Sequence, residues 1–282
     1  MPMFRDLLLY LNDDGHQQAH VASAAALAER LGARLTGLAV SEPLAAHAEY
    51  LPPEALDRYQ AAWRTRNARL AETFTEQTSR FDLVSEWRAV EDLRMDRRTV
   101  DVIALQARYA DLLVIGQVDP DRPADLVPAD LPGQAAVMAG RPVLALPYIE
   151  PQRPIGQRVV VAWDGEREST RALADALPLL VAAEQVQVVM VGEPAGPNDA
   201  EGRGPSAEIA AHLERHAISA QVVNRVSSEG SIADALLASV ADADADLLVM
   251  GAYGGSRFRE LVLGGTTRRI LSEMTVPVLL SH

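Results

Sequence analysis

Five glycines lie close together near the C-terminus, in the segment MGAYGGSRFRELVLGGTTRRIL. Gly251 and Gly254 follow a short apolar run, and Gly264 precedes a helical pattern. Glycine lets the backbone turn sharply and approach a ligand closely, and the first amides of a helix are unpaired donors. Together these features form a cradle for an anion, above all for a phosphate. The segment contains no lysine, so it is not a Walker A loop.

The same pattern occurs earlier in the chain without most of its glycines. Residues 110–147 align with residues 245–282 without gaps, and ADLLVIG lies over ADLLVMG. Asp119 stands where the second copy has a loop glycine, and Ala129 and Asp130 stand where it has Gly-Gly. A carboxylate there would repel a phosphate and fill its space. We therefore predict one competent anion site, in the second half, and a dead site in the first.

Each half alternates short apolar runs with amphipathic stretches, which is typical of a parallel, doubly wound α/β sheet. The expected strands are residues 6–11, 34–40, 83–89, 111–116, 142–147, 158–163, 186–191, 219–226, 246–251 and 277–281. The expected helices are residues 17–31, 54–80, 98–109, 133–139, 168–183, 206–216, 231–243 and 265–274. We predict two tandem five-stranded, Rossmann-like domains, residues 1–149 and 158–282, joined by a Pro-rich linker at 150–157.

Composition restricts the classes of partner. The chain has 282 residues and a net charge of −13, so it attracts neither nucleic acid nor an anionic membrane surface. It has no cysteine, which excludes disulfides and thiolate metal sites. No apolar run is long enough to span a bilayer, and the N-terminus lacks the features of a signal peptide. We expect a cytoplasmic protein.

The glycine segment resembles the nucleotide-binding segment of universal stress proteins, whose pattern is G-x2-G-x9-G followed by Ser or Thr. The final run VPVLLSH resembles the last strand of that family. The resemblance implies ATP, with or without Mg²⁺, with adenosine near the acid after the first strand and phosphates on the loop. Carried onto this sequence, the nucleotide-binding residues are Ala162, Asp164, Val191, Met250, Gly251, Gly254, Gly264, Gly265, Thr266 and Thr267. Gly265 occupies the Ser/Thr position, which removes a hydroxyl from the expected phosphate site.

The resemblance also implies a regulatory role through protein contacts rather than an enzyme. A nucleotide-free interaction or scaffold protein is the alternative that Gly265 and the degenerate first half favour. A slow ATP hydrolase has less support, because no catalytic base is evident. In the family, the last strand pairs with its counterpart in a dimer, so residues 142–147 and 277–281 are expected to pair within one chain. A further homodimer stays open.

Several residues have two interpretations. Either Asp13 or Asp14 matches Asp164, and Trp163 either walls the pocket or packs in the core. Other polar residues are expected to be solvated or capping groups, with no metal site: Arg257, Arg259, Arg268 and Arg269, the stripe Glu208, His212 and His216, the acidic loop Asp119, Asp121, Asp125 and Asp130, and the acids of residues 241–246.

Overall fold

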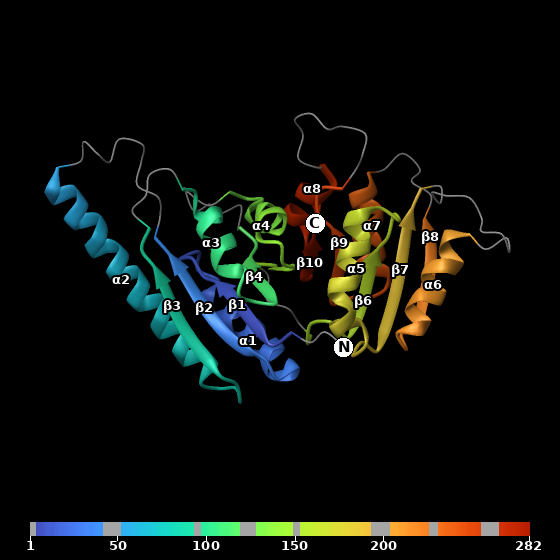
Figure 1. Cartoon of the computed structure of the whole chain (residues 1–282), viewed down its shortest axis with the longest axis horizontal. Coiled ribbons are helices and arrows are strands. Elements are labelled where there is room, and N and C mark those ends of the chain that lie inside the picture. The colour runs from blue at the N-terminus through green and yellow to red at the C-terminus, as the bar shows by residue number, and fades with distance from the viewer. Residues whose placement is uncertain are drawn as a thin grey trace.

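The computed structural model describes residues 4–41, 52–92, 97–118, 128–148, 153–192, 204–225, 231–254 and 265–282. Ten strands form one sheet in the order β3-β2-β1-β4-β5-β10-β9-β6-β7-β8 (Figure 1). All neighbours are parallel except β5 and β10, which are antiparallel. Each half is thus a parallel five-stranded α/β unit of the predicted class, and the two halves meet edge to edge.

The strands and helices agree with the predicted ranges to within a few residues. The strands are β1 (Asp6–Tyr10), β2 (Arg34–Val40), β3 (Ser85–Val90), β4 (Leu112–Gly116), β5 (Val143–Leu146), β6 (Arg158–Ala162), β7 (Gln185–Val191), β8 (Ala220–Arg225), β9 (Leu247–Gly251) and β10 (Val278–Ser281). The helices are α1 (Gln17–Leu31), α2 (Pro53–Thr78), α3 (Thr99–Ala107), α4 (Leu131–Ala139), α5 (Arg167–Leu180), α6 (Pro205–Arg215), α7 (Ile232–Asp242) and α8 (Gly265–Glu273). None of the helices in these ranges combines the length and the hydropathy of a membrane span.

Burial follows the position of each strand in the sheet. The central strands β4, β5, β9 and β10 are almost wholly buried, whereas the outermost strands β3 and β8 are half-buried or exposed along their length. Helices α1, α2, α5 and α6 pack on one apolar cluster, and α3, α4, α7 and α8 pack on the other. Strand residues alternate between the two clusters, as the period of two requires. Both clusters contain residues from both halves of the chain.

The junction between the halves is the predicted pairing of the two last strands. Val278 pairs with Ala145, and Leu280 pairs with Val143. The C-terminus consequently lies at the centre of the molecule (Figure 1). The inner edge strand of each five-stranded unit is covered in this way, which removes an apolar edge that each unit would otherwise expose.

One expectation about the acidic run at residues 241–246 is wrong. Asp246 is buried, and its carboxylate accepts the backbone N–H groups of Gly156, Gln157 and Arg158 at 2.6, 2.9 and 2.9 Å. Asp111 holds the amides of Arg5 and Asp6 in the same manner in the first half. In each half, an acid before the fourth strand therefore fixes the start of the first strand. The backbone amides that it accepts, three for Asp246 and two for Asp111, replace hydrogen bonds to water.

The strand order places a topological switch point between the first and fourth strands of each half. In the C-terminal half, the chain runs from β6 to β7 on one side, and β9 lies on the other side of β6. The connections therefore leave the carboxyl ends of β6 and β9 in opposite directions. Ligands of open α/β sheets bind at such a switch point, and the residues predicted for nucleotide binding come from these strand ends.

Candidate functional site

A pocket of about 140 Å³ lies at the switch point of the C-terminal half. Eight of the ten residues predicted from the sequence line this pocket. The described lining comprises Ala162, Trp163, Asp164, Glu168, Ser169, Val189, Val191, Ile232, Leu236, Met250, Gly251, Gly254, Thr266 and Thr267. Gly265 begins α8 but is not part of this lining, and Gly264 lies outside the described residues. The volume resembles that of a cavity that holds one benzene ring, about 150 Å³, so it suits one ring system rather than a whole nucleotide.

The inner wall of the pocket is apolar. Val189 and Val191 come from β7, Met250 comes from β9, and Ile232 and Leu236 come from α7. Trp163 both lines the pocket and packs against the core, so its two interpretations hold together. A pocket with an apolar wall and a small number of polar groups favours a flat heterocycle, which it binds by burying the apolar faces of the ring.

Asp164 organises the entrance. Its Oδ1 accepts the backbone N–H of Glu166 at 3.0 Å and the hydroxyl of Ser169 at 2.6 Å. Gly165 between them has a φ of 78°, a left-handed conformation that a side chain would strain. The acid thus caps the turn that starts α5 and also lines the pocket. Both of these hydrogen bonds use Oδ1.

One of the loop glycines has a reason that does not involve a ligand. A Cβ at Gly251 would lie 2.7 Å from the Cβ and the carbonyl carbon of Glu168, because the first turn of α5 packs directly on the end of β9. A Cβ at Gly254 would lie 3.0 Å from Oε2 of Glu168. Close helix–strand approach therefore accounts for Gly251, whereas the contact at Gly254 is with the end of a flexible side chain, and a Cβ at Gly265 would meet nothing within 4 Å.

The structure separates the two threonines that could replace the missing hydroxyl. Thr267 is buried, and its Oγ1 accepts the backbone N–H of Tyr253 at 3.1 Å. Tyr253 has a φ of 54°, so this bond holds a left-handed turn immediately after β9. Thr266 is half-buried and lines the pocket. Of the two hydroxyls, that of Thr266 is therefore the one better placed to meet a ligand.

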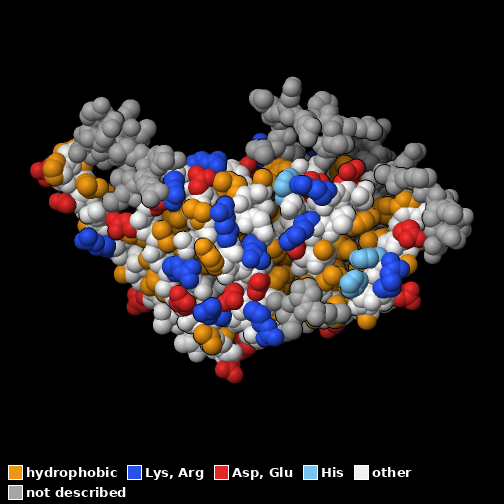
Figure 2. All heavy atoms as spheres, in the orientation of Figure 1, with side chains coloured by type: hydrophobic (Ala, Val, Ile, Leu, Met, Phe, Trp, Pro, Cys, Tyr) orange, Lys and Arg blue, Asp and Glu red, His pale blue; other side chains and the backbone are white. Residues whose placement is uncertain are grey.

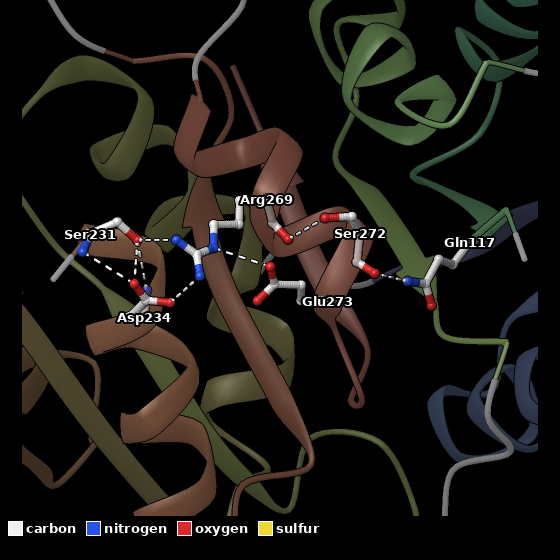
Figure 3. Close-up of polar contacts among 6 residues, drawn as sticks. All are labelled: Gln117, Ser231, Asp234, Arg269, Ser272 and Glu273. Carbon is white, nitrogen blue, oxygen red and sulfur yellow. Dashed lines mark hydrogen bonds and ion pairs between the residues drawn. The ribbon is translucent and has the colours of Figure 1, made fainter. Parts of the chain in front are cut away.

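The helix after the glycine loop, α8, is held on both sides (Figure 3). Arg269 bonds to the α7 N-terminus, with 3.1 Å to the Ser231 hydroxyl and 2.6 Å to an Asp234 carboxylate oxygen. The Arg269 guanidinium also contacts Glu273 at 3.1 Å. On the other side, the Gln117 amide of the N-terminal half donates to the carbonyl of Ser272 at 3.2 Å.

Arg268 pairs across the junction with Asp130, at 3.6 Å. Arg268 and Arg269 are therefore ion-paired side chains on the surface of α8. Arg257 and Arg259 lie outside the described residues. Figure 2 shows basic and acidic side chains interspersed over the visible face, without a single-sign field. Burial and the charge of Asp130 raise the pKa of Tyr253, which lies beside this pair, to about 12.

The equivalent place in the N-terminal half is filled differently. Asp14 accepts the amide of His16 at 2.8 Å, as Asp164 accepts that of Glu166, so Asp14 rather than Asp13 is the counterpart. The ring of His20 lies against Gly116, where an added Cβ would be 2.3 Å from Cε1. Its Nε2 lies 3.3 Å from the carbonyl oxygen of Pro147. His20 is buried, and this burial lowers its pKa despite the opposing charge of Asp14.

The histidines of the predicted polar stripe do not line the pocket. His212 and His216 lie side by side on α6, with ring centroids 5.0 Å apart. Within the described ranges no three His, Asp or Glu side chains converge as metal ligands. Asp119, Asp121 and Asp125 of the N-terminal loop lie outside those ranges. Sequence reasoning missed Glu168, whose only signal is its place in the first turn of α5, four residues after Asp164.

The fold and the pocket together define a tandem α/β protein with a ligand crevice at a switch point. The family model of the universal stress protein family matches residues 156–282. Residues 156–282 therefore form a domain of the universal stress protein family.

Solved structures extend this likeness to the whole fold. A universal stress protein from Archaeoglobus fulgidus has a TM-score of 0.71 at 16% identity, over 99% of this chain and 97% of that chain. A functionally unknown protein from Pseudomonas aeruginosa PAO1 has a TM-score of 0.58 at 18% identity, over 99% and 92%. Universal stress protein Slr1230 from Synechocystis sp. is 44% identical over 50 residues. That match spans 18% of this chain and 17% of the curated relative.

Proposed function

We propose that this chain is a cytoplasmic, universal-stress-type regulator that binds one adenine nucleotide, ATP, in its C-terminal half. It would act through protein contacts rather than as an enzyme. The observation that carries the proposal is the apolar pocket at the switch point, whose described lining includes eight of the residues assigned from sequence. Val189, Val191 and Leu236 would hold the adenine ring by burial.

The polar groups at the mouth suit the rest of the ligand. Asp164 Oδ2 would accept a ribose hydroxyl, since the hydrogen bonds from Glu166 and Ser169 both end on Oδ1. The Thr266 hydroxyl and the first amides of α8 would meet the phosphates, because helix N-termini present unpaired N–H donors to anions. Mg²⁺ would accompany the phosphates as part of the ligand.

A nucleotide-free interaction protein is the second candidate. It is favoured by the contact at Gly251, because the packing of α5 alone explains why this position has no side chain. Gly265 also favours this second candidate, because it stands where the family pattern has a Ser or Thr hydroxyl. The two candidates differ in one measurable property, namely the occupancy of the pocket.

Purification without added nucleotide, followed by mass spectrometry of the released small molecules, tests the proposal. We expect an adenine nucleotide at about one per chain, or an ATP titration with that stoichiometry in calorimetry. Gly254→Asp should weaken ATP binding roughly tenfold or more, because it puts a charge beside the phosphates. Ala182→Asp adds the same charge at an exposed turn outside the pocket and should leave the affinity unchanged. Empty protein that ignores added ATP would support the second candidate.

A further inference from the structure

One carboxylate in the pocket opposes the charge of the proposed ligand. Glu168 lies in the first turn of α5 and lines the pocket, and its Oε2 lies 3.0 Å from the point that a Cβ at Gly254 would occupy. The carboxylate therefore lies against the backbone at the first part of the glycine loop. Its side chain is 17% exposed, so water screens it only in part.

Among the described side chains, one cation pairs with Glu168. This partner is the neighbouring Arg167, at 3.3 Å, whose side chain is 74% exposed. Solvent around Arg167 weakens the pair, and the N-terminus of α5 offsets the carboxylate charge only in part. Asp164, a second acid in the same lining, adds to the negative potential. Two arginines of α8 follow the pocket threonines in sequence, and both are paired with other acids. Arg268 pairs with Asp130, and Arg269 pairs with Asp234 and Glu273.

The pocket thus has two zones of different character. Its apolar wall, formed by Val189, Val191 and Leu236, accepts an uncharged ring. Its mouth, beside Gly254, carries a carboxylate where a phosphate chain would pass. Like charges a few ångströms apart at a partly desolvated site repel strongly, and each further phosphate charge increases that repulsion.

We propose that Glu168 is a specificity-determining residue that selects ligands by charge, admitting the nucleoside readily and penalising the free polyphosphate. This inference rests on the proposed function, because it concerns the same pocket. It makes adenosine a tighter ligand than metal-free ATP for the natural protein. A divalent cation on the phosphates reduces the penalty, since it neutralises the charge that Glu168 repels.

Calorimetric titration of the full chain with adenosine and with ATP, each in EDTA and in Mg²⁺, tests the inference. The variant is Glu168→Gln, which keeps the shape and removes the charge. In EDTA we expect it to tighten ATP binding about tenfold or more and to change adenosine binding less than about threefold. Added Mg²⁺ should strengthen ATP binding more in the natural protein than in the variant.

The matched control is Glu184→Gln, which removes the same charge from an exposed residue outside the pocket. It should change neither affinity by more than about threefold, because exposed charges beyond a Debye length are screened. Equal effects of the two variants, or equal effects of Glu168→Gln on adenosine and ATP, would overturn the inference while leaving the proposed function in place. Absence of binding by both ligands to both the natural protein and Glu168→Gln would overturn the proposed function and the inference together. Thermal melting of each variant checks that the fold is intact.

Discussion

At the scale of single residues, Gly251 shows that one glycine can satisfy two demands. The first turn of α5 packs on it so closely that any side chain would meet the Glu168 backbone and Cβ at 2.7 Å. The same position lines the pocket. A glycine motif read from sequence therefore carries packing information as well as ligand information, and the two must be separated by experiment.

Gly251→Ala should lower the free energy of unfolding by roughly 1–3 kcal/mol, because the added methyl overpacks a contact with backbone atoms that cannot move freely. Urea unfolding without nucleotide measures this change. Gly265→Ala is the matched control, since its Cβ would meet nothing within 4 Å and alanine favours a helix over glycine. We expect that control to be neutral or stabilising by up to about 1 kcal/mol. Similar losses in both variants would contradict the packing explanation.

At the scale of elements, His20 fixes α1 against the ends of β4 and β5. Its ring touches Gly116 at the end of β4 and lies within hydrogen-bond range of the Pro147 carbonyl just after β5. Asp14, also buried, lies 4.0 Å from its Nδ1. The imidazole takes the space beside the fourth strand that the first turn of α5 takes in the other half. Both halves therefore fill this space, each with a different residue, and the single competent site stays a prediction.

The burial of His20 predicts a pH dependence of stability. Burial lowers its pKa below the usual value of about 6.5, so the unfolded chain takes up the proton first as the pH falls. This contribution is complete above about pH 6.5 and is lost progressively below it. Urea unfolding of the natural protein should show a lower free energy at pH 5.5 than at pH 7.5. His20→Gln should reduce that difference, and an unchanged difference would exclude His20 as its source.

At the scale of the whole molecule, the sheet and both apolar clusters run through the two halves. Leu7 and Leu173 belong to one cluster, and Ile103 and Ile270 belong to the other. Gln117 and Asp130 add polar bonds across the junction to α8. These contacts couple the halves, so we expect them to unfold together rather than in two steps.

Tryptophan fluorescence can test this coupling, because Trp63 and Trp87 lie in the N-terminal half and Trp163 lies in the C-terminal half. A Trp163→Phe variant reports on the first half, and a Trp63→Phe/Trp87→Phe variant reports on the second. Urea midpoints of each variant by fluorescence and by far-ultraviolet circular dichroism should coincide, as two-state unfolding requires. Two separate transitions within one variant would show that the halves are independent.

Much of the fold was predictable, because it depends on local periodicity and on an internal repeat. Apolar runs such as those of β4 and β9 mark buried parallel strands wherever they lie in the chain. The pairing of β5 with β10 was also predictable as a way to cover two apolar edges, and it is confirmed.

What sequence reasoning did not reach depends on contacts between distant segments. Asp246 is buried because the amides at 156–158 meet it, and nothing in its own neighbourhood signals this. Glu168 enters the pocket because α5 lies across the end of β9. Eight of the ten predicted nucleotide-binding residues lie around one pocket, and their role in binding stays a prediction.

The antiparallel pairing of β5 with β10 has a consequence for how such a molecule can change over time. A tether between the halves replaces a bimolecular encounter with an intramolecular one, and effective concentrations for short tethers reach about the millimolar range. Assembly of this interface is therefore independent of cellular abundance. Each half also pairs with the same partner half in every molecule. A substitution on one side of the β5–β10 interface therefore needs to be compatible only with the other half of the same chain. Asymmetries such as histidine against Gly116 and glutamate against Gly251 can accumulate under this arrangement without the self-complementarity that a symmetric pair of identical chains would demand.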